Sequence, residues 1–144
     1  FFCPVGSRCA GAVMLRFPRG SMKALRSIIV DDESSSRRLL AKLLGAHAEI
    51  AVVGEARSVQ DAVSLCAQLR PAVIFLDVNM PKQSGLELLA LLTEKPDIVF
   101  VTAHTDYMSE AFAVGACDYL LKPVSGERLE ITVKRLVALS SRNS

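Results

Sequence analysis

Four separate stretches of the chain each place a charged or reactive side chain directly after an apolar run. These side chains are Asp31 and Asp32, Asp77, Thr102 and Lys122. If the apolar runs are strands that end at one edge of a sheet, three carboxylates, a hydroxyl and an ammonium meet there. Two like charges about 4 Å apart repel by about 4 kcal/mol at a surface-like dielectric. The carboxylates therefore favour either protonation or a bound cation.

A hard divalent cation would remove this repulsion. Carboxylate oxygens and water suit Mg²⁺, which proteins commonly hold through one or two carboxylates together with a phosphate. No His or Cys belongs to the set, which argues against zinc. Lys122 can pair with Asp77 or with an anion attached to it, and Thr102 can contact the same anion. The set resembles a cradle for a transferred phosphoryl group, in which Asp77 itself can be the nucleophile.

Alternating strand and helix patterns must position these residues. The predicted strands are 25–30, 50–56, 72–76, 97–101 and 118–121, and the predicted helices are 34–47, 58–70, 85–92, 106–116 and one that begins after Ser125. Serines at 34–36, Ser58, Ser84 and Ser125 are suited to the N-caps. Alternation of this kind predicts an α/β fold with a doubly wound parallel sheet. In such sheets ligands bind outside the carboxyl ends of the strands, where the acidic residues lie.

Composition limits the classes of protein to which the chain can belong. It has 144 residues, of which 51% are hydrophobic and 22% charged, which is typical of one globular domain. No apolar run reaches the roughly 18 residues that a membrane-spanning helix needs, so no membrane association is expected. The net charge is only +2, and no basic stripe indicates direct DNA binding. Cys66 and Cys117 are expected to pack as small hydrophobic residues in a reducing cytoplasm.

Residues 1–21 differ from the rest of the chain. They contain Arg8, Arg16 and Arg19 but no acidic residue, and they lack strand or helix periodicity. We interpret them as a vector-derived, read-through or disordered leader, and residues 22–144 as the folded domain. A signal peptide is the alternative, but the stretch has no basic start and its apolar part, 10–15, is short.

Motifs within residues 24–138 resemble the receiver domain of two-component response regulators. The motifs are "IIVDDE", "VIFLDVNMPKQSGLELL", "IVFVTAH" and "DYLLKP". The stretch "VTAHTDYMSEAFAVGACDYLLKPV" is further similar to receivers that precede a LytTR-type DNA-binding domain. The resemblance implies a flavodoxin-like fold, with a doubly wound five-stranded parallel sheet in the order 2-1-3-4-5 and five helices.

The resemblance also implies a role for each acidic residue. A phosphohistidine of a sensor histidine kinase would donate its phosphoryl group to Asp77. Asp32, Asp77 and the backbone carbonyl of Asn79 would bind Mg²⁺, and Asp31 would act on the ion mostly through water.

The remaining site residues would respond to the phosphoryl group. Lys122 would pair with its oxygens, and the Lys122-Pro123 peptide would be cis, as X-Pro bonds allow. Thr102 would move to hydrogen-bond the phosphoryl group, and Tyr119 would turn inward as a switch. The expected output is dimerisation of a cytoplasmic signalling module, which would reach DNA only through an effector domain that these residues do not include.

Two alternatives remain at this point. The first is a receiver-like domain that signals through protein binding without phosphorylation. The second is a phosphatase of the haloacid dehalogenase class, which also uses an Asp nucleophile. That class expects a second Asp two residues after the nucleophile, where this sequence has Asn79. The expected protein is therefore a signalling module and not a metabolic enzyme.

Overall fold

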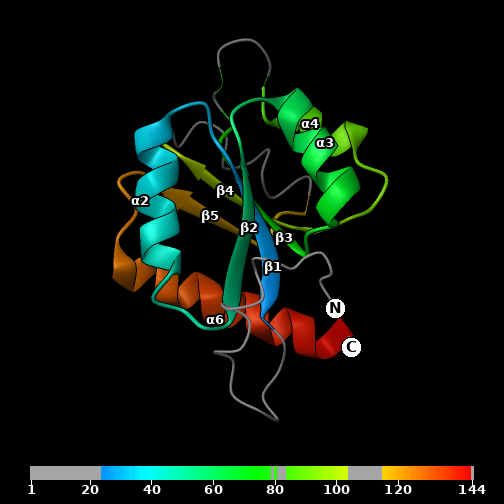
Figure 1. The fold of residues 1–144 in the computed structure, drawn as a ribbon. Helices are drawn as coiled ribbons and strands as arrows, with labels where there is room; N and C mark the ends of the chain where they lie inside the picture. The colour runs from blue at the N-terminus through cyan, green and yellow to red at the C-terminus, as the bar shows by residue number, and fades with distance from the viewer. Residues whose placement is uncertain (1–23, 79, 81–83, 104–114, 144) are drawn as a thin grey trace, which may run out of the picture.

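A sheet of five parallel strands forms the centre of the molecule, as can be followed in Figure 1. The structure, a computed structural model, describes residues 24–78, 80, 84–103 and 115–143. Its strands are β1 (Leu25–Val30), β2 (Ile50–Ala56), β3 (Val73–Leu76), β4 (Asp97–Thr102) and β5 (Asp118–Leu121). Its helices are α2 (Ser34–Leu44), α3 (Val59–Leu69), α4 (Leu86–Leu91) and α6 (Gly126–Asn143). The sheet order β2-β1-β3-β4-β5 confirms the predicted doubly wound topology.

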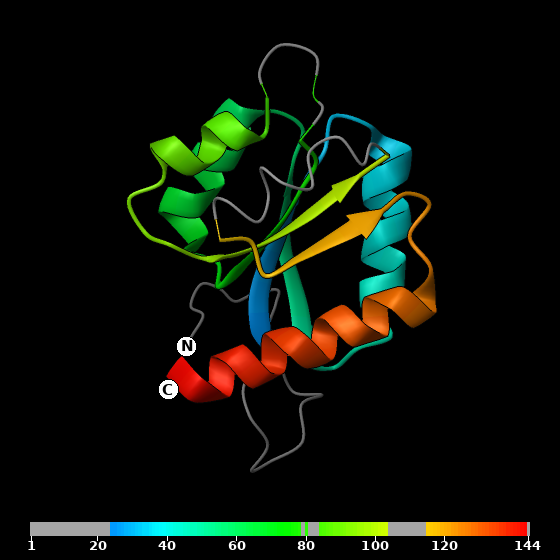
Figure 2. The same ribbon diagram turned by 180° about the vertical axis from the view of Figure 1, so that it is seen from behind.

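The sheet is buried on both faces, which explains why its central strands are continuously apolar. Ile28 and Val30 of β1 pack on the face that α3 and α4 cover, together with Leu88 of α4. Ile29 packs on the opposite face, with Leu40 of α2 and helix α6. Figures 1 and 2 show the same division, with α3 and α4 on one side of the sheet and α2 and α6 on the other. The two cores hold the strands rigidly in register.

The observed element bounds differ little from those expected. Strand β3 begins one residue late, at Val73, and β4 ends one residue late, at Thr102. Helix α2 ends at Leu44, because Gly45 and the residues after it form turns whose N–H groups bond to its last carbonyls.

Some predictions fall on residues that the structure does not describe. They are the leader at 1–21, Asn79, and the helix at 106–116 except for its last two residues. Gly115 lies in a turn with a φ of 80°, so a helix in this region does not extend to Ala116. In the described part of the chain, no helix is long and apolar enough to cross a bilayer.

The predicted serine caps are confirmed at α3 and α6 and wrong at α2, and at α4 the N-cap is Gly85, one residue after the predicted Ser84. The Ser58 hydroxyl accepts a hydrogen bond from the Asp61 N–H at 3.1 Å, and Ser125 accepts one from the Arg128 N–H at 3.1 Å. At α2 the N-cap is Glu33, which makes no side-chain cap bond. Its carboxylate instead accepts a bond from the Ser36 hydroxyl at 3.1 Å. The serines of 34–36 lie inside the first turn of α2 and do not precede it.

A buried carboxylate ties the start of β5 to α6. Asp118 accepts two hydrogen bonds from Arg128, at 2.6 and 3.1 Å, and one from the Thr132 hydroxyl at 2.6 Å. The Tyr119 N–H donates to it at 2.8 Å, and Arg135 lies 3.1 Å away. Burial alone raises the pKa of the Asp118 carboxyl, but these hydrogen bonds outweigh it and the net shift is downward. The network therefore stabilises the folded state while Asp118 is ionised.

Replacing this carboxylate should make stability less dependent on pH. Because the pKa of Asp118 is lower in the folded state, its contribution is present above the ordinary Asp value of about 4 and is lost as pH falls through the folded value. Asp118→Asn should lower the free energy of unfolding by about 2 kcal/mol at pH 7. Urea denaturation between pH 7 and about 3 should show the gap to wild type narrowing as Asp118 becomes protonated in the folded state.

Glu130→Gln is the matched control, because it removes one negative charge from the exposed face of α6. Glu130 pairs only with Lys134 among the ion pairs of the described residues, with 57% and 76% of the two side chains exposed. Its loss should change the free energy of unfolding by less than about 0.5 kcal/mol. Equal effects of the two substitutions would contradict a specific role for Asp118.

Candidate functional site

Backbone hydrogen bonds carry the sheet one residue past the ends of its strands. The Asp31 N–H donates to the Ala56 carbonyl at 3.0 Å, and the Asp77 N–H donates to the Val30 carbonyl at 2.9 Å. The Lys122 N–H donates to the Thr102 carbonyl at 2.9 Å. The strand ends therefore fix the backbones of these residues at the carboxyl edge of the sheet.

Three carboxylates meet at this edge. Asp31, Asp32 and Asp77 each offer an oxygen, and these oxygens lie within 4.8 Å of one another. Asp31 and Asp77 are buried, whereas Asp32 is exposed. The Asp31 carboxylate also accepts a hydrogen bond from the Glu33 N–H at 2.9 Å, which fixes its orientation. The acidic cluster predicted from the sequence is thus present, with its exposed member facing solvent.

Lys122 is the counter-charge of this cluster. Its Nζ lies 2.7 Å from Asp31 Oδ2 and 3.4 Å from Asp77 Oδ2, and 3.9 Å from Glu33 Oε1. It also donates to the Ser36 hydroxyl at 3.4 Å. Burial lowers the pKa of the Lys122 ammonium, but the hydrogen bonds and charges of Asp31 and Asp77 outweigh burial and raise the pKa overall. The ammonium therefore stays charged at neutral pH.

The Lys122-Pro123 peptide is cis, as expected from the sequence. The peptide begins the connection from β5 to α6.

A hollow of about 340 Å³ lies beside this peptide and is lined in part by Asp31, Ser36, Leu39 and Lys122. The site is therefore open to solvent on the side that α2 borders.

The donor set fits a hard divalent cation. Among the described residues the cluster consists of carboxylates alone, with oxygen atoms close enough to share one ion. Mg²⁺ prefers such oxygen ligands and retains several waters. Asp31, Asp32 and Asp77 are the residues that could hold it. The exposed Asp32 leaves one side of the cluster accessible to the ion and its waters.

The two predicted switch residues are both buried. Thr102 has no exposed surface, and Tyr119 is 6% exposed. The Tyr119 ring lies next to Phe100, with ring centroids 6.4 Å apart and planes tilted by 51°. Thr102 is the last residue of β4 and Tyr119 lies in β5, as expected from the sequence. Their movement on phosphorylation stays a prediction.

Sequence reasoning missed two residues that support the cluster. Arg37 donates to the Asp31 carbonyl at 2.6 Å and pairs with Glu55 at 3.2 Å. Gly85 packs against Asp77 so closely that a Cβ there would collide with the Asp77 carbonyl oxygen. A helical arginine and a glycine before a helix are common sequence features. Only the tertiary fold brings them to Asp31 and Asp77.

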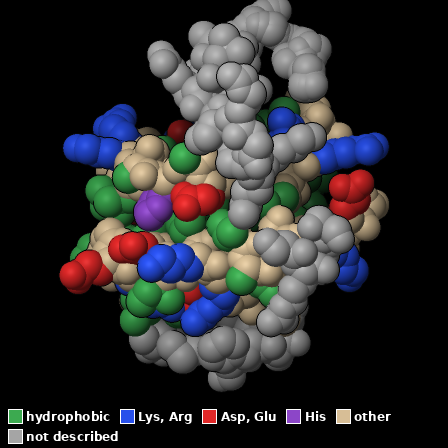
Figure 3. All heavy atoms as spheres, turned by 90° about the horizontal axis from the view of Figure 1, so that it is seen from below, with side chains coloured by type: hydrophobic (Ala, Val, Ile, Leu, Met, Phe, Trp, Pro, Cys, Tyr) green, Lys and Arg blue, Asp and Glu red, His purple; other side chains and the backbone are tan. Residues whose placement is uncertain are grey.

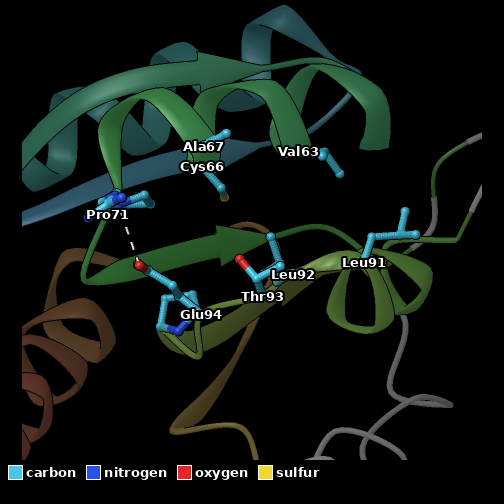
Figure 4. Close-up of a pocket in the computed structure, with 10 residues that line it drawn as sticks. Val63, Cys66, Ala67, Pro71, Leu91, Leu92, Thr93 and Glu94 are labelled. Atoms are coloured by element: carbon cyan, nitrogen blue, oxygen red, sulfur yellow. Dashed lines mark ion pairs between the residues drawn. The ribbon is translucent and has the colours of Figure 1, made fainter.

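A second groove lies away from the carboxylates (Figure 4). Its volume is about 280 Å³, and Val63 and Cys66 of α3 face Leu92 and Thr93, which follow α4, across it. Burial, and after it the charge of Glu94, raises the pKa of the Cys66 thiol, which makes it a poor nucleophile. This agrees with the structural role expected for Cys66.

Cys117 has a similar environment at the start of β5. Burial and the neighbouring Asp97 raise the pKa of its thiol to about 11. Like Cys66, it is a free cysteine.

Acidic and basic side chains are interspersed over the face shown in Figure 3, and no basic stripe is visible among the residues coloured there.

Comparisons with known proteins agree with this geometry. Residues 28–134 match the family described as response regulator receiver domain. An uncharacterised response regulatory protein from Vibrio cholerae is 45% identical over 115 residues, which cover 78% of this chain and 48% of that protein. The transcriptional regulatory protein BtsR of Salmonella typhi is 44% identical over 114 residues, with the same two coverages of 78% and 48%. The chain thus spans about half the length of these curated relatives.

Solved structures show the same likeness. The response regulatory domain of mrkE from Klebsiella pneumoniae superimposes with a TM-score of 0.75 at 30% identity, covering 82% of this chain and 99% of that one. The REC domain of the response regulator AraT from Geobacillus stearothermophilus gives a TM-score of 0.74 at 29% identity, covering 84% and 99%. The fold, the acidic cluster and the match over 28–134 agree, and the chain belongs to the receiver domains of two-component response regulators.

Proposed function

We propose that this receiver domain accepts a phosphoryl group on Asp77 from the phosphohistidine of a sensor kinase. The observation that carries the proposal is the position of Lys122, whose Nζ lies between Asp31 and Asp77 beside the three carboxylates. An Asp77 oxygen would attack phosphorus as the bond from phosphorus to the histidine nitrogen breaks. That nitrogen leaves with the bonding electron pair and takes up a proton.

The residues around Asp77 would lower the cost of bringing more negative charge to an acidic site. The Lys122 ammonium can leave Asp31 and pair with a phosphoryl oxygen, because Asp77 is already within 3.4 Å of it. Asp32, Asp31 and Asp77, with the Asn79 carbonyl, would hold Mg²⁺. When bound, Mg²⁺ neutralises charge on the carboxylates and on the phosphoryl oxygens. The Thr102 hydroxyl would donate to the same oxygens.

The chemical change at Asp77 would then alter the surface near β4 and β5. The phosphoryl group carries about two negative charges in place of the single charge of the Asp77 carboxylate, and it brings strong hydrogen-bond acceptors. Shifting two states from 1:99 to 99:1 needs about 5.5 kcal/mol of differential interaction, which contacts to Thr102, Lys122 and the metal can supply. Tyr119 and Thr102 would couple the site to this surface, which would form a homodimer. A DNA-binding effector domain of the LytTR type would give the output, consistent with the transcriptional relative BtsR.

Phosphorylation should depend on Asp77 and on Mg²⁺. We expect wild-type protein incubated with acetyl phosphate and Mg²⁺ to gain the mass of one phosphoryl group. Asp77→Asn should abolish the gain, because an amide cannot form an acyl phosphate, and chelation of Mg²⁺ with EDTA should also abolish it. Intact-mass spectrometry follows the product directly.

Asp61→Asn is the matched control, because Asp61 is an exposed acid on α3 that pairs with Arg57. This variant should be phosphorylated like wild type. A folded wild-type domain that binds Mg²⁺ but never gains the phosphoryl mass would support signalling by protein binding alone. Rapid turnover of acetyl phosphate without build-up of the phosphorylated form would support a phosphatase.

Lys122→Ala should separate the role of the Lys122 ammonium in phosphoryl transfer from its effect on Mg²⁺ binding. The variant loses the ammonium that neutralises the phosphoryl oxygens, so its rate of phosphorylation should fall on the order of a hundredfold. Mg²⁺ should bind at least as tightly as to wild type, because it no longer competes with the ammonium for Asp31. Calorimetric titration with Mg²⁺ and the rate of mass gain measure the two effects.

The exposed Lys134→Ala serves as the control for loss of one positive charge, since 76% of the Lys134 side chain is exposed. It should leave both the metal affinity and the phosphorylation rate unchanged. If Lys122→Ala loses stability and phosphorylation in equal measure, Lys122 has a structural role and the proposal for this residue is wrong.

A further inference from the structure

We propose that Arg37 is a positioning residue for the metal-binding part of the site, acting through the backbone of Asp31. The inference rests on the proposed function, because it concerns the same Mg²⁺ ion. In the described part of the chain, Arg37 makes no ion pair with the carboxylates of Asp31, Asp32 or Asp77. Its guanidinium instead holds the loop that carries Asp31 and Asp32.

The contacts of Arg37 join three elements. Its Nη1 donates to the Asp31 carbonyl at 2.6 Å, and its Nε donates to Glu55 Oε1 at 3.2 Å. The Arg37 N–H also donates to the Glu33 carbonyl at 3.1 Å, which is a first-turn bond of α2. One residue thus connects the start of α2, the loop after β1 and the end of β2. The Arg37 side chain is 17% exposed and that of Glu55 is 43% exposed, so the bond to the Asp31 carbonyl is the better shielded of the two side-chain bonds.

This anchor completes the fixation of Asp31. The Asp31 N–H is bound to Ala56, and its carboxylate is bound to the Glu33 N–H and to Lys122. The Asp31 carbonyl is the remaining backbone group, and Arg37 binds it. Without Arg37 the peptide plane between Asp31 and Asp32 loses its restraint. The exposed Asp32 side chain would then sample orientations that do not face Asp77.

The geometry requires a guanidinium. Two nitrogen atoms of Arg37 bind two acceptors on different elements, which the planar, rigid fork of arginine allows. A lysine at position 37 has one terminal nitrogen on a flexible stem, so it can reach Glu55 or the Asp31 carbonyl but is poorly suited to hold both. Residues that orient metal ligands commonly change metal affinity by about 10- to 100-fold when replaced.

The test compares Arg37→Met with Arg38→Met. Arg38 is the next residue of α2 and is exposed, so the two variants lose the same charge from the same helix. The chain has no Trp whose fluorescence could report Mg²⁺ binding. Calorimetry is therefore suitable for measuring the Mg²⁺ dissociation constant. Arg37→Met should weaken Mg²⁺ binding about tenfold or more, whereas Arg38→Met should bind like wild type. At saturating Mg²⁺, the rate of phosphorylation of Arg37→Met should return to within about threefold of wild type, since a positioning role acts mainly on metal affinity.

Arg37→Lys keeps the charge and covers the case in which Arg37→Met fails to fold. It should also weaken Mg²⁺ binding, with urea denaturation in EDTA reporting stability separately. Unchanged Mg²⁺ affinity in a folded Arg37 variant overturns the inference, and so does an equal loss in Arg38→Met. If wild type itself binds Mg²⁺ and is phosphorylated on Asp77, either result leaves the proposed function intact. A folded wild type that does not bind Mg²⁺ overturns both.

Discussion

The contact between the Lys122 ammonium and the two buried carboxylates of Asp31 and Asp77 is the interaction on which the site depends. Carboxylates as close as these repel strongly when they are partly removed from water. At 2.7 Å from Asp31 and 3.4 Å from Asp77, the ammonium offsets this repulsion. The same group is the natural partner for incoming phosphoryl oxygens. One cation therefore serves both the folded domain and its proposed chemistry.

The two cores make this contact possible by fixing the strand ends. β1, β3 and β5 deliver the three charged groups, and the hydrogen-bonded ladder extends past each strand to the reactive residue. At the opposite edge of the sheet, Asp118 ties β5 to α6 through Arg128 and Thr132. Lys122 is therefore carried by a strand that is anchored at its start and paired with β4 along its length.

The sequence predicted the strands and the main members of the cluster well, because both depend on local pattern. Apolar runs that end in a charge mark buried parallel strands, and their shared direction brings Asp31, Asp77 and Lys122 to one edge. What it could not predict depends on distances between elements. Arg37 has no pattern that points to a carbonyl on another element, and the contact between Gly85 and Asp77 exists only in the packed fold. The failed serine cap at α2 is similar, since Glu33 and Ser36 bond to each other there.

Asp31 and Lys122 are 91 residues apart in the sequence, which has a consequence for folding during synthesis. The acidic groups emerge from the ribosome early, whereas their counter-ion arrives with the last strand. Until β5 docks, the nascent domain holds repelling carboxylates without this partner. On the proposed chemistry, the domain can be phosphorylated only after β5 has joined the sheet and brought Lys122 to the site. Fragments that end before β5 would therefore accept no phosphoryl group from a kinase.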